Sequence, residues 1–248
     1  MSWRWVTLGA LIALVTTPVL WKVSVGLANP FRHWSEARWD SAGLAPDPAA
    51  TPEAVVQVYA ARAWGWKGIF AVHTWLVMKR EGAPRYERYE VVGWGVRGGS
   101  PAVRKDMRAV DGYWAGNPPR VVIDRRGPEA GALIDRIEAA IATYPYPNEY
   151  RAWPGPNSNT FIAHIARSVP ELGLELPPTA IGKDYLANGS VFAATPSGTG
   201  YQMSLLGLFG LAIGRDEGLE LNLFGMTLGI DPLDLAIKLP AVGRIGLL

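Results

Sequence analysis

The stretch WPGPNSNTF, residues 153–161, decides how this chain is interpreted. Its two prolines restrict the backbone, and residues 157–161 then begin an apolar stripe that is typical of a helix and that Pro170 ends. Asn157 or Ser158 is therefore expected to cap this helix by accepting hydrogen bonds from the free N–H groups of its first turn. The same N–H groups and the helix dipole can stabilise a negative charge beside Ser158. The sequence leaves two roles open for Ser158: a helix cap, or a nucleophile beside a backbone oxyanion hole.

A serine hydroxyl needs a base before it can act as a nucleophile at neutral pH, so a histidine must reach it. His164 lies six residues beyond Ser158, about 120° around the helix, and is expected to pack at its side. His33 is expected at the surface of a linker. His73 lies within the apolar run 69–78, a predicted buried strand in which an imidazole needs a partner. Ser158 and His73 are therefore the candidate nucleophile and general base.

Composition excludes several other kinds of site. The chain has 248 residues and no cysteine, so disulfides, thiolate nucleophiles and cysteine-ligated zinc are excluded. The three histidines and the scattered carboxylates have no metal-ligand spacing, and the glycines of residues 93–99 lack the strand–turn–helix context of a dinucleotide site. A net charge of +2 without long runs of one sign gives no electrostatic case for nucleic acid. We therefore expect no metal, no cofactor and no nucleic-acid partner.

The N-terminus differs from the rest of the chain. Residues 6–20 are apolar apart from three threonines, and Trp3, Trp5 and Trp21 flank them as interfacial aromatic residues flank a membrane segment. We expect residues 1–28 to be a membrane anchor or an uncleaved signal, with the lipid bilayer as its partner. Positive charges on the two sides of this segment are nearly balanced, but we favour an orientation with the soluble domain outside the cytoplasm.

The rest of the chain mixes helix and strand patterns and predicts an α+β fold. Beyond about residue 186 the pattern is that of antiparallel strands: residues 201–213 are too short to span a membrane, and residues 219–223 alternate apolar and polar side chains. The other predicted elements are, in order, a linker over 29–56, a short helix over 55–63, strands over 69–78 and 86–96 that form a hairpin, a short strand over 121–123, and helices that begin near residues 127 and 158.

Two of these segments resemble the circularly permuted papain-like hydrolases and acyltransferases, which include the lecithin retinol acyltransferase-like group and permuted relatives of the NlpC-type peptidases. Residues 71–75, Ala-Val-His-Thr-Trp, resemble the strand that contains the histidine, and residues 157–161 resemble the helix start that contains the nucleophile. The resemblance covers about residues 68–170 and implies an antiparallel sheet packed on helices. This chain has Ser158 where that group has a cysteine.

The resemblance also implies a third polar residue, on the neighbouring strand, that orients His73. Glu87, Tyr89 and Glu90 lie in the expected region, and Glu90 is on the same side as His73 if the register of the hairpin allows it. We take Glu90 as the third candidate of the site, with the other two left open.

The chain also resembles a bacterial family, the domain of unknown function 3750, which supplies no activity. The matching pieces are His73-Thr-Trp75, Glu90-Val-Val-Gly-Trp94, the segment Tyr150 to Phe161, Ala180-Ile-Gly-Lys-Asp-Tyr185 and, beyond these, the region of Pro196 to Gly200. Four residues in these pieces are expected to support the site: Trp75, Trp153, Asn157 and Asn159.

These inferences predict a permuted papain-like domain that hydrolyses or transfers at an amide or ester bond. The expected parts are an N-terminal anchor (1–28), a linker (29–56), the papain-like domain (57–186) and a C-terminal β extension (187–248). We expect a single span in the bacterial inner membrane and a periplasmic domain. The alternative is a catalytically inactive, membrane-tethered binding or accessory subunit of a larger membrane complex, in which Ser158 is a helix cap.

Overall fold

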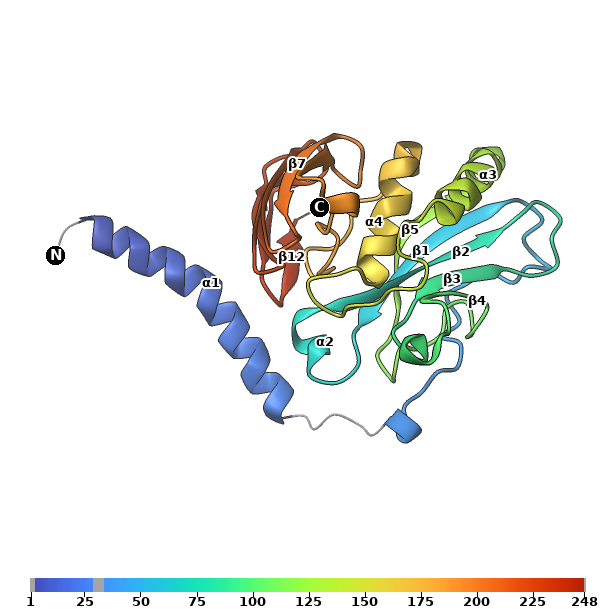
Figure 1. The fold of residues 1–248 in the computed structure, drawn as a ribbon, viewed down its shortest axis with the longest axis horizontal. Helices are drawn as coiled ribbons and strands as arrows, with labels where there is room; N and C mark the ends of the chain where they lie inside the picture. The colour runs from blue at the N-terminus through green and yellow to red at the C-terminus, as the bar shows by residue number, and fades with distance from the viewer. Residues whose placement is uncertain (1–2, 29–33, 248) are drawn as a thin grey trace.

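The structure is a computed structural model that describes residues 3–28 and 34–247, and it has two antiparallel sheets with helices between them (Figure 1). The first sheet has the strand order β4-β3-β2-β1-β5. Its strands are β1 (Val55–Arg62), β2 (Val72–Lys79), β3 (Glu87–Val91), β4 (Val103–Lys105) and β5 (Arg120–Arg126). The predicted α+β class is confirmed.

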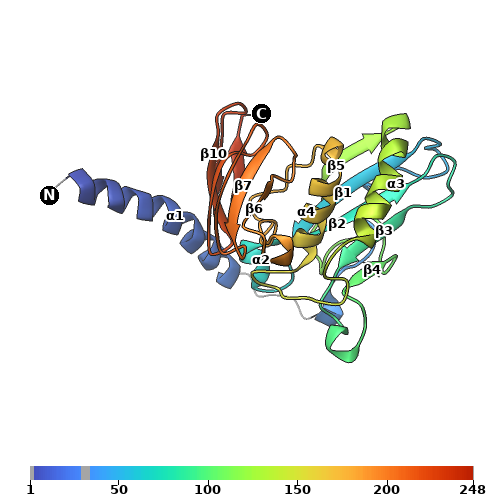
Figure 2. The same ribbon diagram turned by 45° about the horizontal axis from the view of Figure 1, so that its top comes forward.

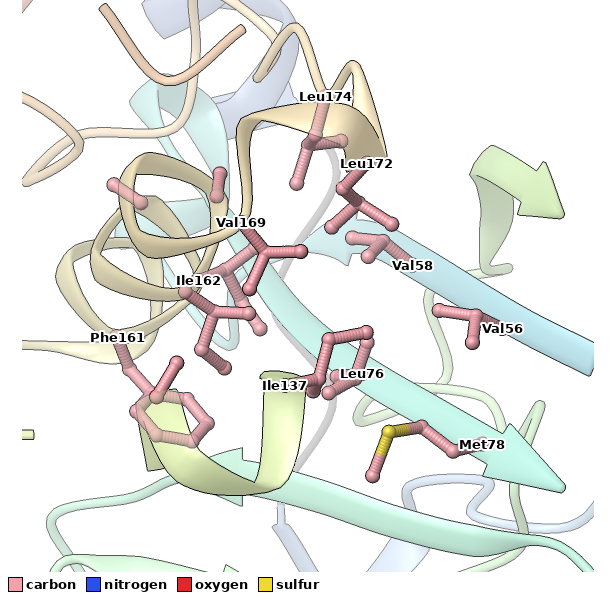
Figure 3. Close-up of a cluster of buried hydrophobic side chains, with 14 of the residues drawn as sticks. Val56, Val58, Leu76, Met78, Ile137, Phe161, Ile162, Val169, Leu172 and Leu174 are labelled. Carbon is pink, nitrogen blue, oxygen red and sulfur yellow. The ribbon is translucent and has the colours of Figure 1, made fainter. Parts of the chain in front are cut away.

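Two helices cover one face of this sheet, and the main core lies between them and the strands. They are α3 (Pro128–Ala142) and α4 (Ser158–Ser168), at the positions where the sequence predicts them. Figure 3 shows the apolar side chains of this core, among them Leu76 from β2, Ile137 from α3 and Ile162 from α4, all of them buried. The core therefore fixes the N-terminus of α4 against the sheet.

The short helix predicted over residues 55–63 is wrong, because this segment is β1. It lies between β2 and β5, and both of its faces are buried. Val56 and Val58 contact the core under the helices, whereas Val55 and Tyr59 pack with Trp75 on the other face. β-Branched and aromatic residues suit a strand that is covered on both sides, and this tertiary burial decides the conformation. The hairpin predicted after it is formed by β2 and β3.

The second sheet is formed by the C-terminal part of the chain, in the order β12-β11-β10-β9-β8-β7-β6. It lies beyond α4, on the side away from the first sheet (Figures 1 and 2). Its strands are β6 (Phe192–Ala194), β7 (Gly200–Leu205), β8 (Phe209–Gly214), β9 (Gly218–Leu223), β10 (Met226–Asp231), β11 (Ala236–Leu239) and β12 (Gly243–Gly246). Single turns of 3-10 helix occur at Trp34–Glu36, Val96–Gly98, Pro170–Leu172 and Ala187–Gly189. The antiparallel strands predicted beyond residue 186 are therefore present.

The N-terminal segment forms a helix, α1 (Trp3–Ala28), that extends from the body on the side of the second sheet (Figures 1 and 2). Its C-terminal end meets α2 (Lys67–Phe70), where a Cβ added at Gly26 would lie 2.6 Å from Ile69 Cδ1. Across residues 3–28 and 34–247, no helix combines the length and the apolar character needed to cross a membrane. His33, residues 1–2 of the predicted anchor and the start of the predicted linker lie outside the described residues.

Candidate active site

The N-terminus of α4 is capped by Asn157, not by Ser158. The Asn157 side chain accepts hydrogen bonds from the backbone N–H groups of Asn159 (2.9 Å) and Thr160 (3.2 Å). Thr160 completes a capping box, because its hydroxyl accepts from the Asn157 N–H at 3.1 Å. Ser158 is the first residue of the helix, and the cap does not use its side chain. Of the two caps that the sequence allows, the structure selects Asn157.

Two asparagine amides fix this helix start to its surroundings. The Asn159 amide donates to the carbonyls of Val72 (3.0 Å) and Ile181 (2.7 Å), and its oxygen accepts from the Thr74 hydroxyl at 2.9 Å. The Asn157 amide donates to Ile181 O at 3.1 Å. Both asparagines are buried, and β2 provides two of these partners. The supporting residues Asn157 and Asn159 therefore hold the backbone of Ser158 beside β2.

Replacement of Asn157 by alanine is expected to lower the free energy of unfolding by about 2 kcal/mol or more, because the cap is lost and buried backbone groups lose their partners. The exposed Asn148, whose side chain has no hydrogen bond among the described residues, is a matched control, and Asn148→Ala should change stability by less than about 0.5 kcal/mol. Urea unfolding of both variants measures the difference, and equal effects would show that the cap does not stabilise α4.

His73 is held by a buried carboxylate on the neighbouring strand. His73 Nε2 lies 2.9 Å from Glu90 Oε2, and the same oxygen accepts a hydrogen bond from Arg88 Nη2 at 3.0 Å. Glu90 and Arg88 are each at most 1% exposed. Glu87 and Tyr89 belong to the opposite face of β3, because side chains alternate along a strand, and Glu87 pairs there with Lys105. Of the three residues left open by the sequence, the structure places Glu90 on His73.

Opposing effects set the pKa values of this group. Burial lowers the pKa of His73 below its ordinary 6.5, although the hydrogen bond and charge of Glu90 act in the other direction. Burial alone would raise the pKa of Glu90, but the hydrogen bond from His73 and the charge of Arg88 outweigh it, so this pKa lies below 4.5. At neutral pH the site therefore holds a neutral imidazole and an ionised carboxylate. The Nε2 atom is then the protonated nitrogen of His73, and Nδ1 is the basic one.

Aromatic rings pack closely around His73. The Trp114 ring stacks on the His73 ring with 3.5 Å between the centroids and 13° between the planes, and Trp94 stacks on Trp114 in turn. Trp75 lies 5.7 Å from His73, and its indole N–H donates to Val110 O at 2.8 Å. The sequence predicts Trp75 as a supporting residue but gives no signal for Trp94 or Trp114, because loop spacing does not reveal stacking.

Ser158 and His73 line the same cavity, which has a volume of about 860 Å³. Trp153, the fourth supporting residue, stands half-exposed at its edge and donates from its indole N–H to Phe224 O at 3.0 Å. Most of the other walls are apolar or aromatic, and the largest of these residues are Trp64, Trp66, Phe70, Trp94, Trp114, Tyr150, Phe224 and Met226. Sequence reasoning did not find this wall, because its residues come from both sides of the fold.

The polar atoms at the end of α4 are available to a ligand. Among the described residues, neither the hydroxyl nor the backbone N–H of Ser158 has a hydrogen-bonding partner, and the same holds for His73 Nδ1. No hydrogen bond joins Ser158 to His73 in the described part of the chain, although both groups line the cavity. His164 is placed elsewhere: its Nε2 lies 3.0 Å from Ala140 O, as expected for a packing residue.

The fold and the site together define an α+β protein with a serine and a carboxylate-bound histidine in one apolar cavity. The family model described as protein of unknown function (DUF3750) matches residues 53–185, which include β1 to β5, α3, α4 and all three candidate residues. The chain belongs to this family. Neither the curated proteins nor the solved structures contain a match to it.

Proposed function

We propose that the protein is a serine-type hydrolase or acyltransferase that acts on an amide or ester bond, with Ser158 as nucleophile, His73 as general base and Glu90 as the residue that orients His73. The observation that supports this most is the shared cavity: it contains an unengaged serine hydroxyl at a helix N-terminus and an unengaged imidazole nitrogen. The arrangement agrees with the permuted papain-like resemblance, in which the histidine strand precedes the nucleophile helix.

The proposed reaction proceeds in two steps. Ser158 Oγ attacks the carbonyl carbon while His73 Nδ1 takes the hydroxyl proton, and the N–H of Ser158 with the dipole of α4 stabilises the oxyanion. Glu90 accepts from His73 Nε2–H and stabilises the imidazolium that forms. The leaving amine or alcohol receives the proton, and an acyl-enzyme remains. Attack by water then gives hydrolysis, and attack by another nucleophile gives transfer. A bound substrate has to bring Ser158 and His73 into contact, as often happens when an unliganded site closes.

The cavity walls indicate the kind of substrate. A volume of about 860 Å³ lies within the range of sites for small organic ligands. Because five tryptophans and two phenylalanines are among the residues that line the cavity, the acyl or leaving group is expected to be apolar or aromatic. Short aromatic esters are therefore suitable reporters.

The pH dependence follows from the state of His73. Its neutral form is the base, so kcat/KM should be full at neutral pH, persist below pH 6.5, and fall only as the pH passes through the lowered pKa of His73. In Glu90→Gln the carboxylate that raises this pKa is absent, so the remaining activity should be half-maximal at a still lower pH. A profile with its half-point above pH 6.5 in the native protein would contradict this prediction.

The function is tested by labelling the full chain with a fluorophosphonate probe, which reacts with activated serines. We expect labelling of the native protein, none of Ser158→Ala, and little of His73→Ala, with partial recovery of the latter when free imidazole is added. Ser168→Ala, at the other end of α4, should label normally. Labelling that persists in Ser158→Ala, or a folded native protein that neither labels nor cleaves aromatic esters, would contradict the proposal.

A catalytically inactive binding role is the second candidate, and one observation favours it. The His73 ring stacks flat on Trp114 and has no hydrogen bond to Ser158, as in an aromatic wall built only for packing. In that case the cavity binds an apolar ligand without changing it. Native protein that binds an aromatic ester reversibly and returns it intact would support this candidate instead.

A further inference from the structure

The second sheet has the reverse of the usual distribution of side chains. Its inner face, toward α4, is polar: Lys238 and Lys183 both pair with Glu220, at 2.8 Å and 2.6 Å, and Gln202 accepts from Arg167 at 2.7 Å. All five side chains take part in a network between the sheet and the rest of the protein. One-sided antiparallel sheets in water normally have the apolar face inside and the polar face outside. Because the polar side chains of this sheet face inward, the composition of its outer face needs an explanation of its own.

The outer face is apolar in continuous rows across the strands. One row follows the register from β7 to β12 through residues that are 42–62% exposed: Tyr201, Ile213, Leu219, Ile230, Ile237 and Ile245. A second row pairs Phe192, Met203, Leu211 and Leu221 in the same way, and these are 41–59% exposed. Neighbouring strands lie about 4.8 Å apart, so the side chains of the rows are adjacent and form one continuous apolar surface. We call it the outer apolar face.

Two hairpin turns extend this face at one end. Leu206 and Phe224 are each 56% exposed and have positive φ angles of 53° and 54°. Such turns strongly prefer asparagine, aspartate or glycine, because the left-handed conformation strains other residues and water surrounds the turn. The turn at the opposite end of β8 contains Arg215 and Asp216 instead. At the end that contains Arg215 and Asp216, the turn between β10 and β11 also has an exposed apolar residue with a positive φ angle, Leu235 (65% exposed, φ 49°). Exposed apolar side chains at such strained positions indicate an apolar medium along this face.

We propose that the outer apolar face and the turns at Leu206 and Phe224 rest on a lipid bilayer. In the strands as described, no outward side chain is charged, and Tyr201 has the one polar group among the paired rows. Protein partners typically need about one hydrogen bond per 100–200 Å² and a polar rim, whereas hydrocarbon needs neither. The helix α1, with exposed Trp3, Trp5 and Trp21, extends on the same side of the molecule (Figures 1 and 2).

The contact has a consequence for the cavity. Phe224 belongs both to the apolar turn and to the wall of the cavity that Ser158 and His73 line. A bilayer under this turn therefore brings the cavity close to the lipid surface. The surface is inferred without reference to catalysis, so it does not depend on the proposed function.

The absence of cysteine allows a position-specific test with the full chain. Leu211→Cys and Ile213→Cys place a fluorophore on the outer apolar face, and Asp135→Cys places it on α3 as a control. With phosphatidylcholine vesicles that contain a nitroxide on the acyl chain, we expect quenching at Leu211 and Ile213 and none at Asp135. Quenching at Leu211 and Ile213 that is no greater than at Asp135 would overturn the proposal. This result is also the one expected if α1 alone binds the vesicles. Fluorescence changes that depend on protein concentration without vesicles would also overturn it, because they identify a second copy as the occupant.

A charge on the face provides an independent measurement. Leu211→Glu with Leu221→Glu should weaken binding to unlabelled phosphatidylcholine vesicles at least about tenfold, because the carboxylates must enter hydrocarbon. Val121→Glu is a matched control on the first sheet, where Val121 is 38% exposed. Equal binding of the double variant and this control would overturn the proposal.

Discussion

Replacement of Ser158 by alanine is expected to reduce ester or amide turnover by roughly 10⁶-fold, the scale at which removal of a serine nucleophile acts in other serine hydrolases. The fold should not change, because no group among the described residues hydrogen-bonds to the Ser158 hydroxyl and Asn157 caps the helix. The free energy of unfolding should therefore stay within about 0.5 kcal/mol of the native value. Steady-state kinetics with an aromatic ester and urea unfolding measure the two quantities on the same preparations.

The control for this prediction is on the same helix. Ser168 is the last residue of α4, and its hydroxyl donates to His164 O at 2.9 Å. Ser168→Ala removes the same atom at an exposed place far from the cavity, so turnover should be unchanged. If the two alanine variants have equal turnover, Ser158 is not the nucleophile. If Ser158→Ala unfolds easily, its hydroxyl has a structural role that the geometry does not indicate.

Replacement of Arg88 by methionine is expected to lower the free energy of unfolding by about 3–5 kcal/mol at neutral pH, because a buried carboxylate loses its cation. Arg88 is fully buried, lies over the Trp75 ring at 4.3 Å and donates to both Glu90 and Ala109 O. The difference from the native protein should shrink as the pH falls below 4.5. The native pKa of Glu90 is below that value, so the stability contributed by its ionised form is present above pH 4.5 and lost as the pH passes through the lowered pKa.

Arg80, whose ion pairs are exposed, provides a control for the stability loss expected in Arg88→Met. It pairs with Asp135 and Glu138 at 2.7 and 2.8 Å, but its side chain is half-exposed, so Arg80→Met should cost at most about 1 kcal/mol. Adding Glu90→Gln to Arg88→Met should restore part of the stability, because no buried charge then remains. Similar losses in the Arg80 and Arg88 variants would mean that water reaches Glu90.

Local signals in the sequence were sufficient to predict α4, the helix that positions Ser158. The prolines before Asn157, the apolar stripe that follows and Pro170 at the end predict α4 with its bounds. The choice between two possible caps could not be made, because asparagine and serine are nearly equal in preference. The capping box with Thr160 decides it, and that pair depends on side-chain orientation that a sequence does not specify.

Long-range burial explains what the sequence did not reveal. Residues 55–62 form a strand because two neighbouring strands and layers on both faces enclose them. The alternation of residues 219–223 predicts a strand, but not which face is inside; the structure buries Glu220 and Asn222 against partners from other segments. Trp114 reaches His73 from a loop, so no periodic pattern marks it. Each of these outcomes depends on partners distant along the chain.

The residues that cap α4 are different from Ser158, the residue for which a nucleophilic role is proposed. Asn157, Asn159 and Thr160 make all the bonds that define the helix start, and the side chain at position 158 makes none among the described residues. The residue at this position can therefore change without loss of the scaffold. A thiol in place of the hydroxyl would occupy the same place in the cavity that His73 also lines, so Ser158→Cys is a substitution that this helix start should tolerate.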